Sequence, residues 1–168
     1  MAGLPLFEWR DFYVTIGTAS GAIVGATFVV ATLASELKER TVGLRGFITP
    51  SAVYLGSVLV GSAILTAPTL TPVTLAILLG IGGTAGAVYA VIVATRIWKM
   101  NLDLADRACY VFVPVLAYSA IAAAAFLESW AVAWTFDTLA VALVVILMVG
   151  MRNAWDMATF MITRNREQ

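Results

Sequence analysis

The sequence predicts an all-α integral membrane bundle of five transmembrane helices, and its composition and the length of its apolar runs support that prediction. Of the 168 residues, 61% are hydrophobic and only 12% are charged, whereas soluble domains are about half apolar and about a quarter charged. Mean hydropathy is +0.94. Charged side chains this scarce cannot cover the surface of a water-soluble domain. We therefore expect a single transmembrane helical domain over residues 1–168.

Five apolar segments reach the length of about 20 residues that a spanning helix needs. We expect the spans at residues 12–34, 50–67, 72–95, 109–127 and 136–158.

Several prolines predict where these helices begin or bend. Thr49-Pro50 and Thr71-Pro72 each place a capping hydroxyl before a proline, which suits the first turn of a helix. The connection between the second and third spans is very short, so these spans should form an antiparallel hairpin. Pro114 lies inside the fourth span and is expected to kink it.

The far end of the fifth span leaves two alternatives open. Residues 152–156 are polar, but residues 157–162 are apolar again. One long helix, or a span followed by a short interfacial helix, fits this pattern.

Charge and aromatic residues predict the orientation of the bundle. Cytoplasmic loops of membrane proteins carry an excess of Lys and Arg, and five spans place nine of the ten basic residues on one side, with only Arg10 on the other. We expect an N-terminus outside and a C-terminus in the cytoplasm. The nine are Lys38, Arg40, Arg45, Arg96, Lys99, Arg107, Arg152, Arg164 and Arg166. Aromatic belts at headgroup level are expected from Phe7, Trp9, Phe12, Trp130, Trp134 and Phe136 outside, and from Trp98, Tyr110 and Trp155 inside.

Small residues recur at intervals of four within the spans. Gly17, Gly21 and Gly25 share one stripe of the first helix, although glycine inside a helix in water is disfavoured by about 1 kcal/mol relative to alanine. In lipid, small residues let helices approach closely. We expect contact faces here, either within the bundle or against another subunit, with the first helix the best candidate for the latter. The other members are Ala52, Gly56, Ser57 and Gly61 in the second helix, and Gly82, Gly86 and Ala90 in the third.

Several function classes are disfavoured by composition. Net charge is zero, and nucleic-acid binding needs a concentrated basic face. The chain has no histidine and one cysteine, Cys109, so the commonest metal ligand, general base and haem ligand are absent. We expect no enzyme activity, no metal and no cofactor. The middles of the spans carry no ionisable Asp, Glu, Lys or Arg, which argues against a proton-coupled transporter.

The most distinctive polar cluster is Arg152-Asn153-Ala-Trp-Asp156. Arg152 and Asp156 are four residues apart and face each other on a helix. They form either a local ion pair near the headgroups or a cytoplasmic-face contact to lipid phosphate or a partner. Asn153 has the amide to add a hydrogen bond between helices.

Together with residues 10–15 and 44–50, the segment 151–156 makes the chain resemble an uncharacterised family of small bacterial multi-spanning membrane proteins. The Arg-Asn-Ala-Trp-Asp motif is the most specific part of that resemblance. It implies a multi-pass protein of the bacterial cytoplasmic (inner) membrane, and it implies no activity, substrate or site residue.

Three function classes are compatible with these observations. The first is a non-catalytic structural or accessory subunit, which self-associates or joins a larger membrane complex through its small-residue faces. The alternative is a small homo-oligomeric ion channel. The third is a lipid- or quinone-binding module, since apolar grooves between helices hold such ligands.

Overall fold

The computed structural model describes residues 6–36, 42–98, 108–128 and 134–164. Within these ranges every regular element is a helix: α1 (Leu6–Glu36), α2 (Val42–Thr66), α3 (Pro72–Ile97), the π-helical η1 (Ala108–Phe112), α5 (Val113–Glu128) and α6 (Thr135–Arg164). The predicted all-α class is therefore confirmed.

Five stretches of these helices are long and apolar enough to cross a membrane. They are Trp9–Thr32, Thr49–Thr66, Pro72–Arg96, Cys109–Leu127 and Thr135–Asp156.

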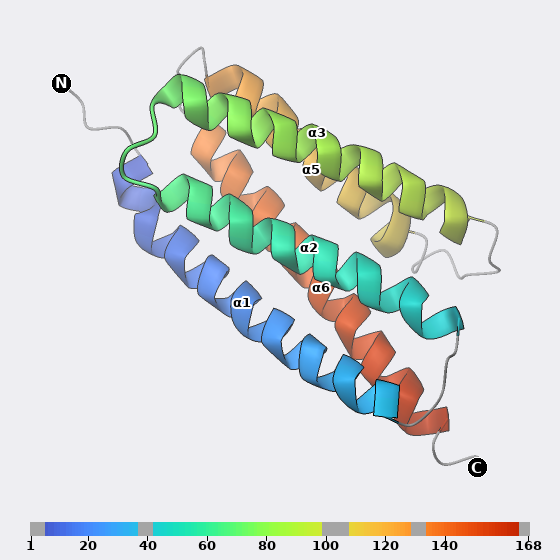
Figure 1. The fold of residues 1–168 in the computed structure, drawn as a ribbon. Coiled ribbons are helices and arrows are strands. Elements are labelled where there is room, and N and C mark those ends of the chain that lie inside the picture. Colours follow the sequence, from blue (N-terminus) through green and yellow to red (C-terminus); the bar gives the residue numbers. More distant parts are fainter. Residues whose placement is uncertain (1–5, 37–41, 99–107, 129–133, 165–168) are drawn as a thin grey trace.

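The helices run alternately up and down the bundle (Figure 1). The starts of α1, α3 and α6 lie at the same end as the last turns of α2 and α5, and their other ends lie at the opposite end. We name the end that holds the starts of α1, α3 and α6 the outer end, and the opposite one the inner end, as the distribution of basic residues predicts.

One predicted helix start is wrong. Helix α2 begins at Val42, so Pro50 lies inside it rather than in its first turn. Proline removes a single backbone donor, and the helix nevertheless continues from Val42 through Pro50 to Thr66. The described stretch Thr49–Thr66 has the length and composition of a span.

The other predicted start is confirmed. Thr71 caps α3 in an extended conformation, with Pro72 at the first helical position. Its hydroxyl oxygen accepts a hydrogen bond from the Thr74 amide at 3.2 Å. The short connection turns the chain back on itself, so α2 and α3 run antiparallel as expected (Figure 1).

The structure also describes the chain just before Pro114 and the far end of the fifth span. The five residues Ala108–Phe112 form a π-helical turn immediately before α5. Proline lacks an N–H and its ring crowds the carbonyl four residues earlier, which here belongs to Tyr110, inside this widened turn. At the other end of the chain, α6 continues unbroken to Arg164. Of the two alternatives for residues 152–162, one long helix is therefore correct.

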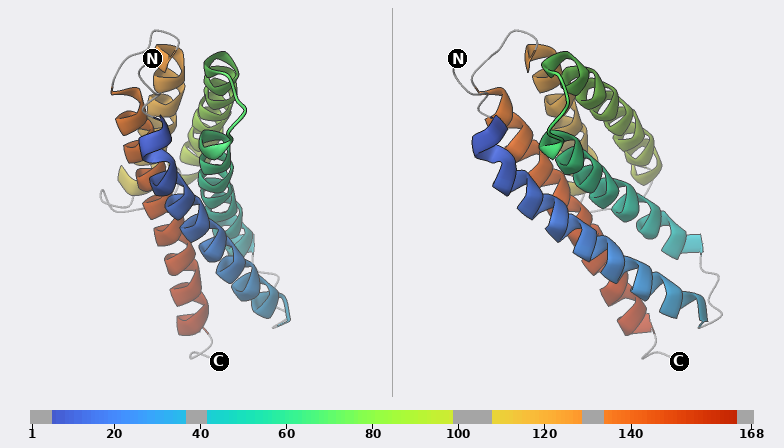
Figure 2. Two further views of the ribbon diagram at one scale, coloured as in Figure 1. Left: turned by 90° about the vertical axis from the view of Figure 1, so that its left-hand side faces the viewer. Right: turned by 60° about the vertical axis from the view of Figure 1, so that its left-hand side comes forward.

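Four helices form a closed ring, and α1 packs outside it. In this ring α3 packs on α5, α5 on α6 and α6 on α2. The contact between α3 and α5 is the most extensive of the four, and the contact between α2 and α3 that closes the ring is the loosest. Helix α1 packs along α2 and touches α6 (Figure 2). The largest fully buried side chains are three tyrosines, Tyr13, Tyr54 and Tyr118.

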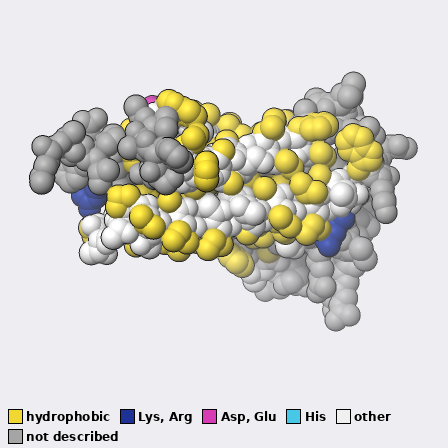
Figure 3. Space-filling view, turned by 90° about the horizontal axis from the view of Figure 1, so that it is seen from above, with side chains coloured by type: hydrophobic (Ala, Val, Ile, Leu, Met, Phe, Trp, Pro, Cys, Tyr) yellow, Lys and Arg dark blue, Asp and Glu magenta, His cyan; other side chains and the backbone are white. Residues whose placement is uncertain are grey.

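The outer surface of the described bundle is apolar along its length. Large hydrophobic side chains such as Phe28, Ile81 and Phe126 are exposed, and the basic side chains visible in Figure 3 lie only toward the two ends. Trp98, Trp134 and Trp155 are exposed near the ends, which fits the expected belts. Phe136 and Tyr110 depart from that expectation, because both are buried in the bundle. Several predicted loop and belt residues lie outside the described residues: Lys38, Arg40, Lys99, Arg107, Trp130 and Arg166, and the side chains of Phe7, Arg45 and Arg164.

Candidate functional site

A polar cluster joins α6 to the start of α5 at the inner end of the bundle. On α6, Arg152 Nε lies 4.0 Å from Asp156 Oδ2, the spacing expected for residues one helical turn apart. Both side chains are close to 40% exposed, at 43% and 41%. Such a pair is partly screened by solvent, so its own contribution to stability is small.

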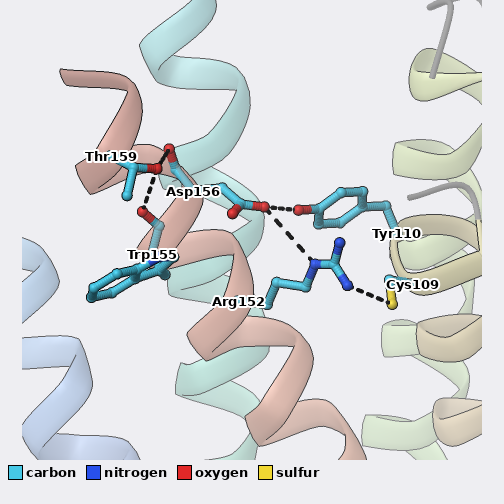
Figure 4. A network of polar contacts seen from close by, with 6 residues as sticks. All are labelled: Cys109, Tyr110, Arg152, Trp155, Asp156 and Thr159. Carbon is cyan, nitrogen blue, oxygen red and sulfur yellow. Dashed lines mark hydrogen bonds and ion pairs between the residues drawn. The ribbon is translucent and has the colours of Figure 1, made fainter. Parts of the chain in front are cut away.

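The π-helical turn brings two further side chains to this pair (Figure 4). The Tyr110 hydroxyl donates a hydrogen bond to Asp156 Oδ2, and Arg152 Nη1 donates to the Cys109 sulfur at 3.3 Å. The guanidinium carbon of Arg152 lies 5.6 Å from the centre of the Tyr110 ring, within cation–π range. The four residues act as a clamp between two helices, which a purely local ion pair would not provide.

The neighbouring amide, Asn153, lies inside the bundle. Asn153 is buried, at 4% exposure, and its Oδ1 has no hydrogen-bond partner within the described part of the chain. The interhelical bond that its position suggested is therefore not made through this oxygen.

The contacts of Tyr110 and Cys109 were missed at the level of sequence. A signal for them exists, because both residues shortly precede Pro114 at the inner boundary of the fourth span. Antiparallel neighbouring helices bring that boundary level with residues 152–156. Within the described ranges, no three Cys, Asp or Glu side chains lie close enough together to hold a metal ion.

Only part of the glycine stripe on α1 contacts another helix of this chain. A Cβ built on Gly17 would lie 2.9 Å from Ser62 Cβ, and one on Gly21 would lie 3.7 Å from Leu59 Cδ1. Helix α2 thus covers the outer two glycines. A Cβ on Gly25 would meet nothing within 4 Å in the described structure.

On α2, too, some of the predicted small residues contact another helix and others do not. Gly61 lies against α6, where a Cβ would be 3.3 Å from Leu143 Cδ2. Gly56 has open space, and Ala52 is half-buried. Ser57 makes a hydrogen bond across helices, to Tyr118 of α5.

On α3 the contact face is rotated from the predicted one. Gly86 packs directly against the Tyr118 ring and Ala90 is fully buried, whereas Gly82 is exposed with no neighbour within 4 Å. The close approach is made by Gly83 instead. A Cβ there would lie 2.6 Å from the backbone nitrogen of Ala122 on α5.

A second polar group lies halfway along the bundle. Ser57 of α2 and Tyr118 of α5 have their hydroxyl oxygens 2.5 Å apart, and Ser57 donates to the Tyr54 carbonyl at 2.7 Å. The ring centres of Tyr54 and Tyr118 are 6.1 Å apart, and those of Tyr54 and Tyr89 are 6.2 Å apart. The absence of Asp, Glu, Lys and Arg from the span middles did not predict this group, and tyrosines inside three apolar runs are the signal that would have found it.

The Ser57–Tyr118 pair forms part of the wall of a crevice inside the four-helix ring. The crevice has a volume of about 100 Å³ and is lined mainly by aliphatic side chains of α2, α3, α5 and α6.

No protein-family profile, curated protein or solved structure matches this chain.

Proposed function

We propose that this chain is a non-catalytic integral protein of a bacterial cytoplasmic membrane, with its N-terminus outside, and that it serves as a structural or accessory subunit. The distribution of charge carries this proposal. The charged side chains that the structure describes all lie near one end or the other of apolar helices of spanning length. They are Arg10, Asp11, Arg96, Asp137, Arg152 and Asp156.

The buried hydroxyl groups support a structural role for this chain, because they join its helices. Tyr13 of α1 donates to the Phe136 carbonyl of α6 at 2.9 Å, and Ser20 of α1 donates to the Leu55 carbonyl of α2 at 2.6 Å. These hydroxyls join helices, as polar side chains do in membrane bundles. The polar cluster at the inner end does the same for η1 and α6.

Uncovered glycine supports assembly with a further helix. Gly25 continues the stripe that α2 covers at Gly17 and Gly21, but nothing in the described chain fills the space beside it. Small residues mark helix contacts in lipid. The exposed inner half of α1 is therefore the proposed contact with a second copy or another membrane subunit.

Native mass spectrometry of the detergent-extracted protein tests this assignment with Gly25→Leu. The leucine has room within the chain, so the bundle should remain folded while the assembled species is reduced. Val88→Leu, at an exposed position of α3, a helix that does not pack on α1, is the matched control and should assemble like the parent.

Two outcomes would count against the proposal. Assembly of Gly25→Leu at the parent's level would remove α1 as the contact. Ion flux into liposomes that contain only the purified chain would favour the channel alternative over an accessory role.

A further inference from the structure

The polar part of the crevice inside the four-helix ring lies at mid-depth of the spans, and its aliphatic part, which includes Ile64, Leu65 and Leu139, extends toward their outer ends. Ser57 and Tyr118 are near the middle of Thr49–Thr66 and Cys109–Leu127, and Gly83 is near the middle of Pro72–Arg96. A ligand site here rests on the proposed membrane insertion. On that basis, whatever enters this crevice comes from the hydrocarbon core of the bilayer.

The crevice has a mouth between α2 and α3. Three of its lining residues are exposed on the outer surface: Val60 of α2, and Leu78 and Gly82 of α3. The residues deeper in the wall, including Leu139 and Leu143, are buried. The mouth coincides with the loosest contact of the ring, so a molecule that diffuses in the bilayer reaches the interior from the side.

The hydrogen bonds in the wall determine which ligand chemistry fits. A hydroxyl has one proton to donate and two acceptor positions. Ser57 gives its proton to the Tyr54 carbonyl, so the proton between Ser57 and Tyr118 comes from Tyr118. Both protons are thereby used, and only acceptor positions remain. A complementary ligand must supply a donor.

The volume of the crevice and its depth in the membrane exclude two further classes of ligand. The crevice holds about 100 Å³, less than the cavity of about 150 Å³ that binds benzene in an engineered protein. A substituted quinone ring is larger than benzene and does not fit. A phosphate headgroup is too costly to desolvate at mid-membrane depth without a cationic partner, and none of the described residues that line the crevice is Lys or Arg.

We propose that this crevice binds a long-chain aliphatic alcohol. The terminal hydroxyl donates to the Tyr118 or Ser57 oxygen, the first carbons fill the interior, and the remaining chain leaves through the mouth beside Gly82. A lipid-soluble molecule with a hydroxyl on an unbranched chain is the chemistry that this wall accepts.

Photolabelling of the full chain in phospholipid nanodiscs tests the proposal. The probe is hexadecanol with a diazirine near the hydroxyl, and the labelled peptides are identified by mass spectrometry. Label is expected on the α2, α3 and α5 segments around Ser57, Gly83 and Tyr118. Unlabelled hexadecanol should compete, and hexadecyl methyl ether should compete about fivefold less well, because it lacks the donor and so loses a hydrogen bond worth about 1 kcal/mol.

A matched pair of variants on α3 tests the entry route. A Cβ at Gly82 meets nothing within 4 Å, so Gly82→Leu should fill the mouth without disturbing the helices and reduce crevice labelling by at least about tenfold. Ile81→Leu changes a neighbouring exposed residue that is not part of the crevice and should label like the parent.

The result that overturns the inference is unchanged labelling in Gly82→Leu, or equal competition by the alcohol and its ether. Insertion is scored separately, by accessibility of Cys109 to a membrane-impermeant maleimide from each side. An inserted and folded protein that does not take up the probe refutes this inference alone, whereas a protein that does not insert refutes the proposed function.

Discussion

Gly82 and Gly83 are adjacent on α3, yet a methyl group added at each would meet different surroundings. At Gly83 the new Cβ would lie 2.6 Å from the Ala122 nitrogen and 3.0 Å from its Cα. Because the obstacle is backbone, no side chain can move aside, and α3 and α5 must separate. At Gly82 the methyl group would meet nothing within 4 Å.

The size of the effect depends on that geometry. Ordinary carbon contacts are about 3.5–4.0 Å, so the helices must move apart by about 1 Å, and a gap of that size forfeits a quarter to a half of the dispersion energy of each contact. Overpacking of this kind costs about 1–3 kcal/mol. The helix-propensity gain of alanine over glycine, about 1 kcal/mol in water, applies to both positions and cancels in the comparison. We therefore expect Gly83→Ala to be less stable than Gly82→Ala by about 1–3 kcal/mol.

Equilibrium unfolding of the two variants measures this difference. Sodium dodecyl sulfate is titrated into protein in mild-detergent micelles, and tryptophan fluorescence reports the midpoint. The same experiment decides between the predicted spacing of Gly82, Gly86 and Ala90 and the observed face of Gly83, Gly86 and Ala90. Equal midpoints, or a lower midpoint for Gly82→Ala, would show that α3 does not present this face to α5.

Two further predictions concern the polar contacts between helices. Tyr13→Phe removes the donor to the buried Phe136 carbonyl and should lower the free energy of unfolding by about 1 kcal/mol in the same titration. In the control, Thr18→Val, the lost hydroxyl donates to the Val14 carbonyl of the same helix, so the free energy of unfolding should be unchanged. Equal effects of the two substitutions would argue against the hydrogen bond between α1 and α6. Arg152→Ala removes the guanidinium that lies beside Asp156 and donates to the Cys109 sulfur and should lower the free energy of unfolding by at most about 1 kcal/mol, because the pair is partly exposed; a loss of several kcal/mol in the same titration would contradict this.

The polar cluster at the inner end, formed by Arg152, Asp156, Tyr110 and Cys109, shows which contacts of a site can be predicted from sequence. The pairing of Arg152 with Asp156 is predicted by helical spacing alone, and the structure brings them to 4.0 Å. The contributions of Tyr110 and Cys109 depend on the π-helical turn before Pro114 and on how α5 faces α6. The sequence places Tyr110 and Cys109 level with residues 152–156, but no local pattern determines that rotation, so it does not specify which side chains meet across the interface.

Pro50 and Pro72 show that a local pattern does not by itself determine where a helix begins. The capping threonine precedes proline in both cases, but only Thr71-Pro72 comes after a turn that ends the previous helix. Residues 42–48 continue the helix upstream of Pro50, because a proline removes one hydrogen bond without preventing those of its neighbours. The dipeptide therefore marks a permitted start, and the conformation of the preceding residues decides whether it is used.

The sequence by itself determined the all-α class and the number of candidate spans. These are sums of residue properties along the chain, and about 20 apolar residues in a row suffice to define each one. Tertiary structure decided which small residues touch, which tyrosines meet Ser57 and Asp156, and where the ring of helices leaves a crevice. The physical reason is that these helices are apolar on nearly every side, so their sequences do not specify which face turns inward. Close packing between particular side chains and backbones selects that rotation.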